Sequence, residues 1–551
     1  MVDALKSLLY AEASRPWTFL ELGFWIFFAV VLVGFAGLER RLALRNAYLM
    51  LASWFFYYHT SQWYVVLLIC TTAVDYGVGH ALHRTQRNLL RKLLLAISII
   101  SNLGVLFFFK YAYFVAEVWN DLTGLTWSPT PFWAGWANGQ LGTNFVEDVI
   151  LLPVGISFYT FQCLSYTVDV YRRNLEPVRH FTDFAFYVSF FPQLVAGPIV
   201  RASEFVPQIY QPYAVTRTQF GLGMFWVLNG FLKKVILADF LAVHLADRIF
   251  SQPTLYTGWE NALGLLAYTM QVYADFSGYT DIAIGISLWM GFTLTKNFDS
   301  PYKAQSVAEF WKRWHMSLSS WLKDYLYIPL GGNRSGSVVS YVLIFAGLFG
   351  LAWWAPTSMV SYALAATVLI FLLLYQFVPV FRRGFNTNIN LLLTMLLGGL
   401  WHGASWNFVV WGGLNGLGLV AYKQWSRVRP YAVEGWLLRA LGVLITLVFI
   451  TFTRIWFRAP DWDTAMAMLD QLTTGWSVPP SLSMLAAWWR PAVVLALGFG
   501  IHWIPEHLKE RYRTAFSSLH PAWMLGAAVV GVLVGYQFMA AESQPFIYFQ
   551  F

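Results

Sequence analysis

The chain has 551 residues, of which 58% are hydrophobic and 12% are charged, with a formal net charge of +8. Uncharged runs such as residues 24–37 and 342–355 belong to apolar segments that approach the length of about 20 residues needed to cross a bilayer. This composition excludes an ordinary soluble α/β domain and indicates a polytopic membrane protein. Because lipid offers no hydrogen-bond partner to an open sheet edge, and barrel strands would alternate, the spans are predicted to be helices.

The first spans are predicted near residues 22–37, 47–58, 62–80, 93–116 and 149–171. Of the segments between them, 39–45 and 84–92 are basic, whereas 59–62 and 120–148 contain no Lys or Arg. The positive-inside bias therefore places the basic segments in the cytoplasm, and the N-terminus and the Trp-rich segment 120–148 outside. The first residues lack the pattern of a removable signal peptide, so we expect none.

The regular alternation ends near residue 189. Residues 189–201 hold Pro192, Gly197 and Pro198 in a short, broken apolar run, which favours a re-entrant or kinked element. Further spans are predicted near residues 220–249, 261–292, 338–355, 359–380, 389–422, 437–457, 488–504 and 522–540. The prediction is one integral, all-α domain over residues 1–551, with about a dozen transmembrane and re-entrant elements.

One segment, WKRWHMSLSSWLKDYLYIPLGGNR from Trp311 to Arg334, mixes aromatic, basic and hydroxyl residues. At helical spacing, apolar side chains from Val307 to Tyr325 share one face and most charged side chains share the other. This pattern predicts an amphipathic helix that lies along the cytoplasmic interface. His315 falls at the edge of the apolar face. Its ring could lie at the membrane interface and reach the lipid headgroups, or it could be a functional side chain, and the sequence leaves both interpretations open.

A second histidine, His402, occurs in GGLWHGASW between two long apolar runs. An ionisable group at membrane depth is expensive and is functional by default. Gly398, Gly399 and Gly403 would let a backbone or a substrate approach the imidazole closely. Burial would keep the ring neutral, which is the form that a general base needs. A hydrogen-bonded structural histidine is the alternative.

Other chemistries lack their usual sequence anchors. No GxSxG, Walker, HExxH or GxGxxG pattern occurs in a suitable context, and Cys70 and Cys163 do not suggest a thiolate metal site. Asp275 and Asp281 lie in the otherwise apolar YADFSGYTDIAIG. Intramembrane carboxylates can relay protons, so a transporter stays open beside a structural role for these two residues.

Three motifs carry a resemblance: DFSGYTDIAIG, NFDSPYKAQSVAEFWKRWHMSLSSWLKDYLYIPLGGNR and GGLWHGASWNFVVWGGLNG. Their order and style resemble the membrane-bound O-acyltransferase (MBOAT) family, and most closely its AlgI-like branch, which O-acetylates exported polysaccharides. The resemblance extends to residues 151–173, 190–201 and 545–551. It implies an O-acyltransferase with an MBOAT-type helical bundle around a central tunnel, core motifs in residues 150–425 and additional C-terminal helices in 436–541.

The resemblance also assigns roles to residues. His402 would be the main catalytic residue and His315 its partner at the tunnel. Because the position that resembles His315 is often Asn in eukaryotic relatives, orienting the donor is favoured there over a role as base. Family members draw an acyl thioester from the cytoplasmic side, and the acyl group emerges outside.

Acetyl-CoA is the donor implied, with no permanently bound cofactor and no metal. Its phosphates would stay cytoplasmic, and the candidate phosphate contacts are Lys312, Arg313, Lys323 and Arg334. Anchoring to anionic lipid is the alternative for each of these four residues. Candidate tunnel-lining residues are Trp314, Trp401, Trp406 and Asn407, with the Asn amide able to polarise the thioester carbonyl and packing as the alternative for the tryptophans.

The expected partners are acetyl-CoA, membrane lipid and a periplasmic SGNH-type acetyltransferase, without nucleic acid, and the expected location is the bacterial inner membrane. Two alternatives remain open. A DltB-like protein would transfer D-alanine toward teichoic acid with the same fold and histidines, and a transporter or flippase would use the intramembrane carboxylates. The apolar elements after about residue 436 favour the AlgI-like architecture. The sequence does not identify the acceptor polysaccharide.

Overall fold

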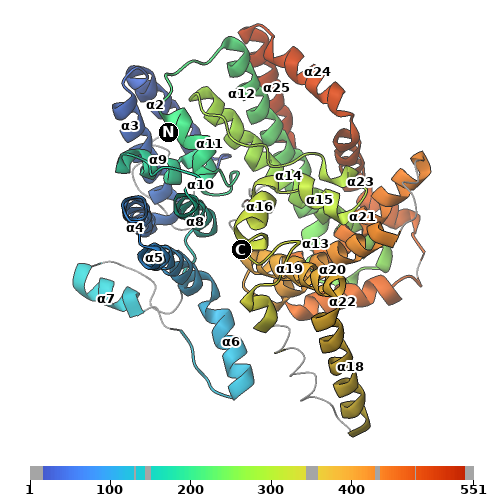
Figure 1. The fold of residues 1–551 in the computed structure, drawn as a ribbon. Coiled ribbons are helices and arrows are strands. Elements are labelled where there is room, and N and C mark those ends of the chain that lie inside the picture. Colours follow the sequence, from blue (N-terminus) through green and yellow to red (C-terminus); the bar gives the residue numbers. More distant parts are fainter. Residues whose placement is uncertain are drawn as a thin grey trace. The chain divides into compact units, whose positions relative to one another are not determined.

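A computed structural model describes residues 17–129, 132–142, 150–342, 346, 358–428, 435–477, 479–539 and 546. Within these residues every regular element is a helix (Figure 1), which confirms the all-α prediction. Most of the predicted span 338–355, part of segment 120–148 and most of the terminal PFIYFQF lie outside the described residues. The described part of segment 120–148 contains helix α7 (Phe132–Leu141).

The chain divides into two compact units. The first unit comprises Met1–Phe298 with Met466–Phe551, and the second comprises Asp299–Ala465. The helices of the first unit are α2 (Leu22–Leu38), α3 (Leu42–Ser61), α4 (Val65–Arg84), α5 (Asn88–Leu106), α6 (Ala112–Thr123), α7, α8 (Ile156–Arg172), α9 (Phe181–Ser189), α10 (Phe191–Leu194), α11 (Ala202–Ile209), α12 (Arg217–Leu232), α13 (Asp247–Ser251), α14 (Gly258–Trp289), α23 (Leu482–Trp503), α24 (Glu506–Ser517) and α25 (Pro521–Phe538).

Several helical segments are long and apolar enough to cross a membrane. Among the described residues, five meet this test by length and composition, namely Leu42–Arg84, Asn88–Thr123, Trp436–Arg458, Leu482–Trp503 and Pro521–Phe538. A sixth candidate is the pair Thr367–Phe377 and Pro379–His402, which is bent by 108°. These lengths and compositions agree with a multi-pass membrane protein.

The broken run 189–201 has the irregular backbone that its prolines and glycine predict. Helix α9 ends at Ser189, α10 lasts only from Phe191 to Leu194, and the backbone is then non-helical up to Arg201. Every residue from Ser189 to Val200 is buried, so this irregular backbone is enclosed by protein.

Asp275 and Asp281 both form ion pairs inside the first unit. Asp281 Oδ2 lies 2.7 Å from Lys233 Nζ, and Asp275 Oδ1 lies 2.6 Å from Lys234 Nζ. The lysines come from a π-helical stretch, Lys233–Asp239, that continues α12 and packs against α14. These buried ion pairs link the π-helical stretch to α14, which gives both carboxylates a structural role.

The helices of the second unit are α15 (Val307–Arg313), α16 (Met316–Trp321), α18 (Ser358–Phe377), α19 (Pro379–His402), α20 (Trp406–Val428) and α21 (Trp436–Arg458). Helix α22 (Trp462–Thr474) begins in this unit and ends in the first. A π-helical turn, Leu322–Tyr327, continues α16.

Two sequence predictions in the second unit require correction. The predicted span 389–422 is two helices, α19 and α20, separated after His402 by residues 403–405. The predicted amphipathic helix over residues 307–325 is interrupted at Trp314 and His315. His315 has a left-handed backbone with φ 44° and ψ 56°, a conformation that an α-helix cannot include.

Candidate active site

Glycines set the distance between α19 and α20 and thereby the position of His402. A methyl group added at Gly399 would collide with the carbonyl oxygen of Phe408, and one added at Gly412 would collide with that of Met395. Only hydrogen at these positions permits such close backbone packing, as in other membrane helix pairs with small residues at the interface. The last turn of α19, which ends at His402, is therefore held directly against α20.

His402 is surrounded by aromatic rings. Its side chain is buried, with the residue only 4% exposed. The centroid of its ring lies 4.9 Å from that of Trp401, 5.1 Å from that of Trp411 and 5.3 Å from that of Phe457. Rings provide little solvation for a charge, so this environment favours the neutral imidazole that a general base requires.

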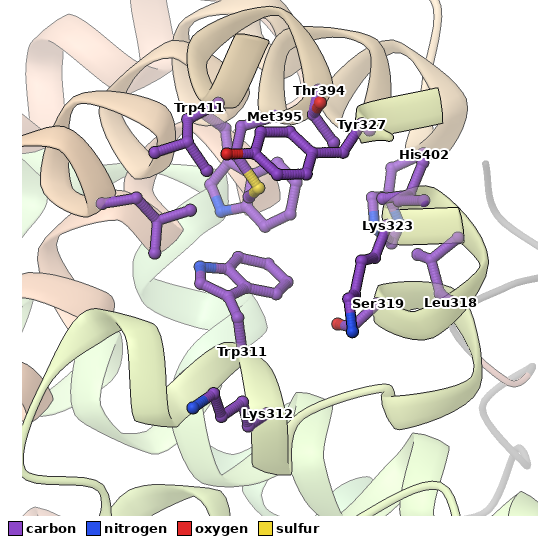
Figure 2. Close-up of a pocket in the computed structure, with 14 residues that line it drawn as sticks. Trp311, Lys312, Leu318, Ser319, Lys323, Tyr327, Thr394, Met395, His402 and Trp411 are labelled. Carbon is purple, nitrogen blue, oxygen red and sulfur yellow. The ribbon is translucent and has the colours of Figure 1, made fainter. Parts of the chain in front are cut away.

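A pocket of about 270 Å³ opens beside His402 within the second unit. Its walls come from α15, α16 with the following π-helical turn, α19 and α20. Figure 2 shows Trp311 extending toward Met395 and Trp411, with His402 on the other side of the pocket. The Trp311 and Trp411 rings meet edge to face at a centroid distance of 5.7 Å. The pocket thus combines mostly apolar walls with one buried imidazole.

Lys312 and Lys323 supply the positive charge of this pocket. Both line it, and both side chains are exposed. Exposed ammonium groups beside an apolar cavity suit a ligand with an anionic head and an uncharged arm.

His315 is fully buried and is not one of the residues that line the pocket. Its Nδ1 is 3.5 Å from Ser317 Oγ, and its ring centroid is 6.0 Å from that of Trp401, which also contacts His402. Burial lowers the pKa of His315 to about 3, so its ring is neutral near pH 7. A left-handed backbone costs a non-glycine residue about 1–2 kcal/mol, and the surrounding packing must compensate.

The other two predicted phosphate contacts are not walls of the pocket. Arg313 forms ion pairs with Asp299 at 3.2 Å and with Glu309 at 2.9 Å, so its guanidinium links α15 to the preceding loop. Arg334 is exposed, beyond the π-helical turn.

The predicted tunnel-lining residues lie outside this pocket as well. Trp401 lies between the two histidines, and Trp314 stacks on Phe310 with an angle of 16° between the rings. Trp406 is 50% exposed. Asn407 donates two hydrogen bonds from Nδ2, to the carbonyl oxygens of Ala459 at 3.1 Å and Asp461 at 3.0 Å. Its amide nitrogen thus binds the backbone that follows α21, and a role in polarising the thioester stays a prediction.

Sequence reasoning missed several residues at the site. Trp311, Met395 and Trp411 line the pocket, although nothing in their apolar surroundings distinguished them from core residues. Arg454, in α21, had a usable signal because it is a charge inside the apolar run 437–457. Among the described residues, no group of three or more His, Cys, Asp or Glu side chains is placed to hold a metal ion.

Comparison with known proteins gives matches over most of the chain. The family model of the MBOAT, membrane-bound O-acyltransferase family matches residues 169–354, a range that includes His315 and ends before His402. The chain is 35% identical over 432 residues to the "Probable alginate O-acetylase AlgI" of Pseudomonas aeruginosa, covering 78% of this chain and 69% of that protein.

Two further relatives are named for other functions. The "Peptidoglycan O-acetyltransferase" of Helicobacter pylori is 34% identical over 449 residues, which cover 77% of this chain and 72% of that protein. The "Teichoic acid D-alanyltransferase" of Streptococcus thermophilus is 26% identical over 336 residues, which cover 55% of this chain and 70% of that protein.

Proposed function

Because this chain belongs to the membrane-bound O-acyltransferase family, we propose that it moves an acetyl group from cytoplasmic acetyl-CoA through a transmembrane tunnel toward an exported polysaccharide. The membership confirms the resemblance seen in the sequence and makes the chain a multi-pass membrane O-acyltransferase. The donor, the tunnel and the acceptor are the proposed parts.

One observation carries the proposal: the buried imidazole of His402 forms part of the wall of a mostly apolar pocket. In the proposed reaction, the hydroxyl oxygen of the acceptor attacks the thioester carbonyl while His402 takes the hydroxyl proton. The new C–O bond forms, the C–S bond breaks, and the departing thiolate takes the proton back from the imidazole. General-base assistance of this kind is worth about 100- to 10,000-fold in rate.

The proposed donor matches the charge distribution of the pocket. Phosphates are too strongly hydrated to enter an apolar cavity, so they would remain with the exposed Lys312 and Lys323 while the uncharged thioester arm enters. Arg334 is proposed as an outer phosphate or lipid contact. Arg313, already paired with two carboxylates, would act by holding α15 in place.

His315 is proposed to help orient the donor indirectly, by holding Trp401 and His402 in place, rather than to exchange protons. Its burial keeps it neutral, and the Trp401 ring contacts both histidines. A displacement of His315 would therefore be transmitted to His402 through this indole.

The names of the O-acetylating relatives suggest a cell-envelope polysaccharide as acceptor, with alginate and peptidoglycan as the two examples that those names give. We propose location in the bacterial inner membrane with the N-terminus outside, and a periplasmic SGNH-type acetyltransferase as the partner that receives the acetyl group. The single integral domain over residues 1–551 also remains a prediction.

D-alanyl transfer is the second candidate, supported by the similarity to the teichoic acid D-alanyltransferase. That similarity is weaker, at 26% identity against 34% and 35% for the two O-acetylating relatives. The transporter alternative loses its main support because Asp275 and Asp281 are paired with lysines.

The donor is tested with purified protein in sealed vesicles, offered either acetyl-CoA or a D-alanyl thioester on a carrier protein. The proposal expects release of free CoA thiol from acetyl-CoA, with label passing to an added periplasmic acceptor fraction. Turnover of the D-alanyl thioester alone would select the second candidate, and no turnover of either donor would refute both.

A further inference from the structure

Arg454 is a buried cation that the proposed reaction does not use. It lies in the last turns of α21, and its residue is 1% exposed. Among the residues that the structure describes, no hydrogen-bond acceptor reaches its Nε or Nη2. A buried guanidinium is expensive unless it is paired, so its retention here calls for a specific role.

The contacts of Arg454 are aromatic rings that lead to both histidines. Its Cζ lies 4.5 Å from the centroid of the Trp314 ring and 5.1 Å from that of Phe457. Trp314 immediately precedes His315 at the break between α15 and α16, and the Phe457 ring contacts His402. Through Trp314 the guanidinium contacts the segment that carries His315, and through Phe457, a neighbour in its own helix, it reaches a ring that contacts His402.

Charged side chains of both signs lie on the elements around Arg454, including the exposed carboxylate of Asp461 just beyond α21. Lys312 and Lys323 face the same pocket as His402, and Arg458 lies one turn further along α21. Arg313 is paired with Asp299 and Glu309, and these two carboxylates are therefore already engaged. A fixed cation in this setting opposes the appearance of a second positive charge on a nearby imidazole.

We propose that Arg454 is a positioning residue for acyl transfer: it stacks on Trp314 and Phe457 to fix both histidines, and its positive charge disfavours protonation of His402. This inference rests on the proposed function. The two contributions are separable, because lysine retains the charge without the flat guanidinium, whereas glutamine removes both.

The test compares purified Arg454→Lys and Arg454→Gln with the unsubstituted protein, using acetyl-CoA cleavage over a range of pH. Arg439→Gln is the matched control, since it removes an arginine from the exposed first turn of the same helix. Arg454→Gln is expected to lower kcat about 10- to 100-fold, with a smaller change in KM. The acidic limb of the pH–rate profile of Arg454→Gln should move to higher pH by about one unit, because His402 is then more easily protonated.

Arg454→Lys should lower kcat but keep the acidic limb of the pH–rate profile within a few tenths of a pH unit of its original position. If Arg454→Gln does not fold, Arg454→Lys decides the question. Melting temperature in detergent separates folding from catalysis. Unchanged kcat and pH profile in folded variants, including variants that only melt earlier, would overturn the inference. An unsubstituted protein without acetyl-CoA turnover would instead refute the proposed function.

Discussion

Replacing Gly412 with alanine should inactivate the protein by separating α19 from α20. The added methyl group would lie 3.1 Å from Leu396 Cα and 3.2 Å from Gly399 Cα, and would overlap the Met395 carbonyl oxygen. Relaxed carbon–carbon contacts are about 3.5–4.0 Å, so the helices must move apart by roughly 0.5–1 Å. All three obstacles are backbone atoms, which cannot rotate away.

The expected magnitudes follow from this displacement. Overpacking costs about 1–3 kcal/mol, and the better helix propensity of alanine returns roughly 1 kcal/mol. The net loss of stability is therefore small, about 0–2 kcal/mol. Activity should fall further, because a displacement of about 1 Å at a reacting group can lower the rate roughly 100-fold. His402, at the end of α19, is the group displaced.

Gly413→Ala is the matched control for this experiment. Its added methyl group would meet only the flexible end of Leu396, at an ordinary contact distance of 3.5 Å. Acetyl-CoA cleavage and melting temperature are measured for both variants in the same detergent. Gly413→Ala should retain the original rate. Equal activity in the two variants would show that the close approach of α19 and α20 does not position the catalytic group.

Further predictions concern His315, Asn407 and the membrane orientation. His315→Asn should retain more acetyl transfer than His315→Ala, because an amide still donates and accepts hydrogen bonds; equal, complete loss in both would support proton transfer at this position. The pKa of His315 is lowered from 6.5 to about 3, so its stabilising contribution is complete above pH 6.5 and is lost as pH falls toward 3. Between pH 6.5 and 5, melting experiments should therefore show the unsubstituted protein losing about 2 kcal/mol relative to His315→Asn, and parallel curves would refute this. Asn407→Ala should lower stability by about 1–3 kcal/mol through the two unpaired carbonyls, and an unchanged melting temperature would contradict that role. Lys323→Cys should be labelled by an impermeant thiol reagent only in inverted vesicles, with protection by acetyl-CoA that weakens in salt; labelling of intact cells would reverse the orientation.

Much of the architecture could be predicted because membrane burial constrains it so strongly. An apolar run of sufficient length must be helical in lipid, so the helices near residues 22–37, 437–457 and 522–540 follow from composition alone. His402 could be singled out in the same way, because an ionisable side chain at membrane depth is energetically costly and is usually kept for function. A pocket lies beside His402, and its catalytic role stays a prediction.

The geometry around His315 could not be predicted, because the helical-wheel argument assumes an unbroken helix. The break depends on a left-handed backbone at a non-glycine residue, which only tertiary packing can stabilise. The hydrogen-bond partners of Asn407 could not be predicted for a related reason: its neighbours in the sequence are His402 and the glycines, but its amide donates to the backbone some 50 residues later.

Acetyl-CoA cleavage by purified His402→Ala in sealed vesicles tests the central claim most directly. His507→Ala, which removes an exposed histidine of α24 in the first unit, is the control. We predict that His402→Ala keeps the melting temperature of the unsubstituted protein and loses about 100- to 10,000-fold in rate, whereas His507→Ala cleaves the thioester normally. A folded His402→Ala protein that still cleaves acetyl-CoA at the original rate would contradict the claim that this pocket is the site of acyl transfer.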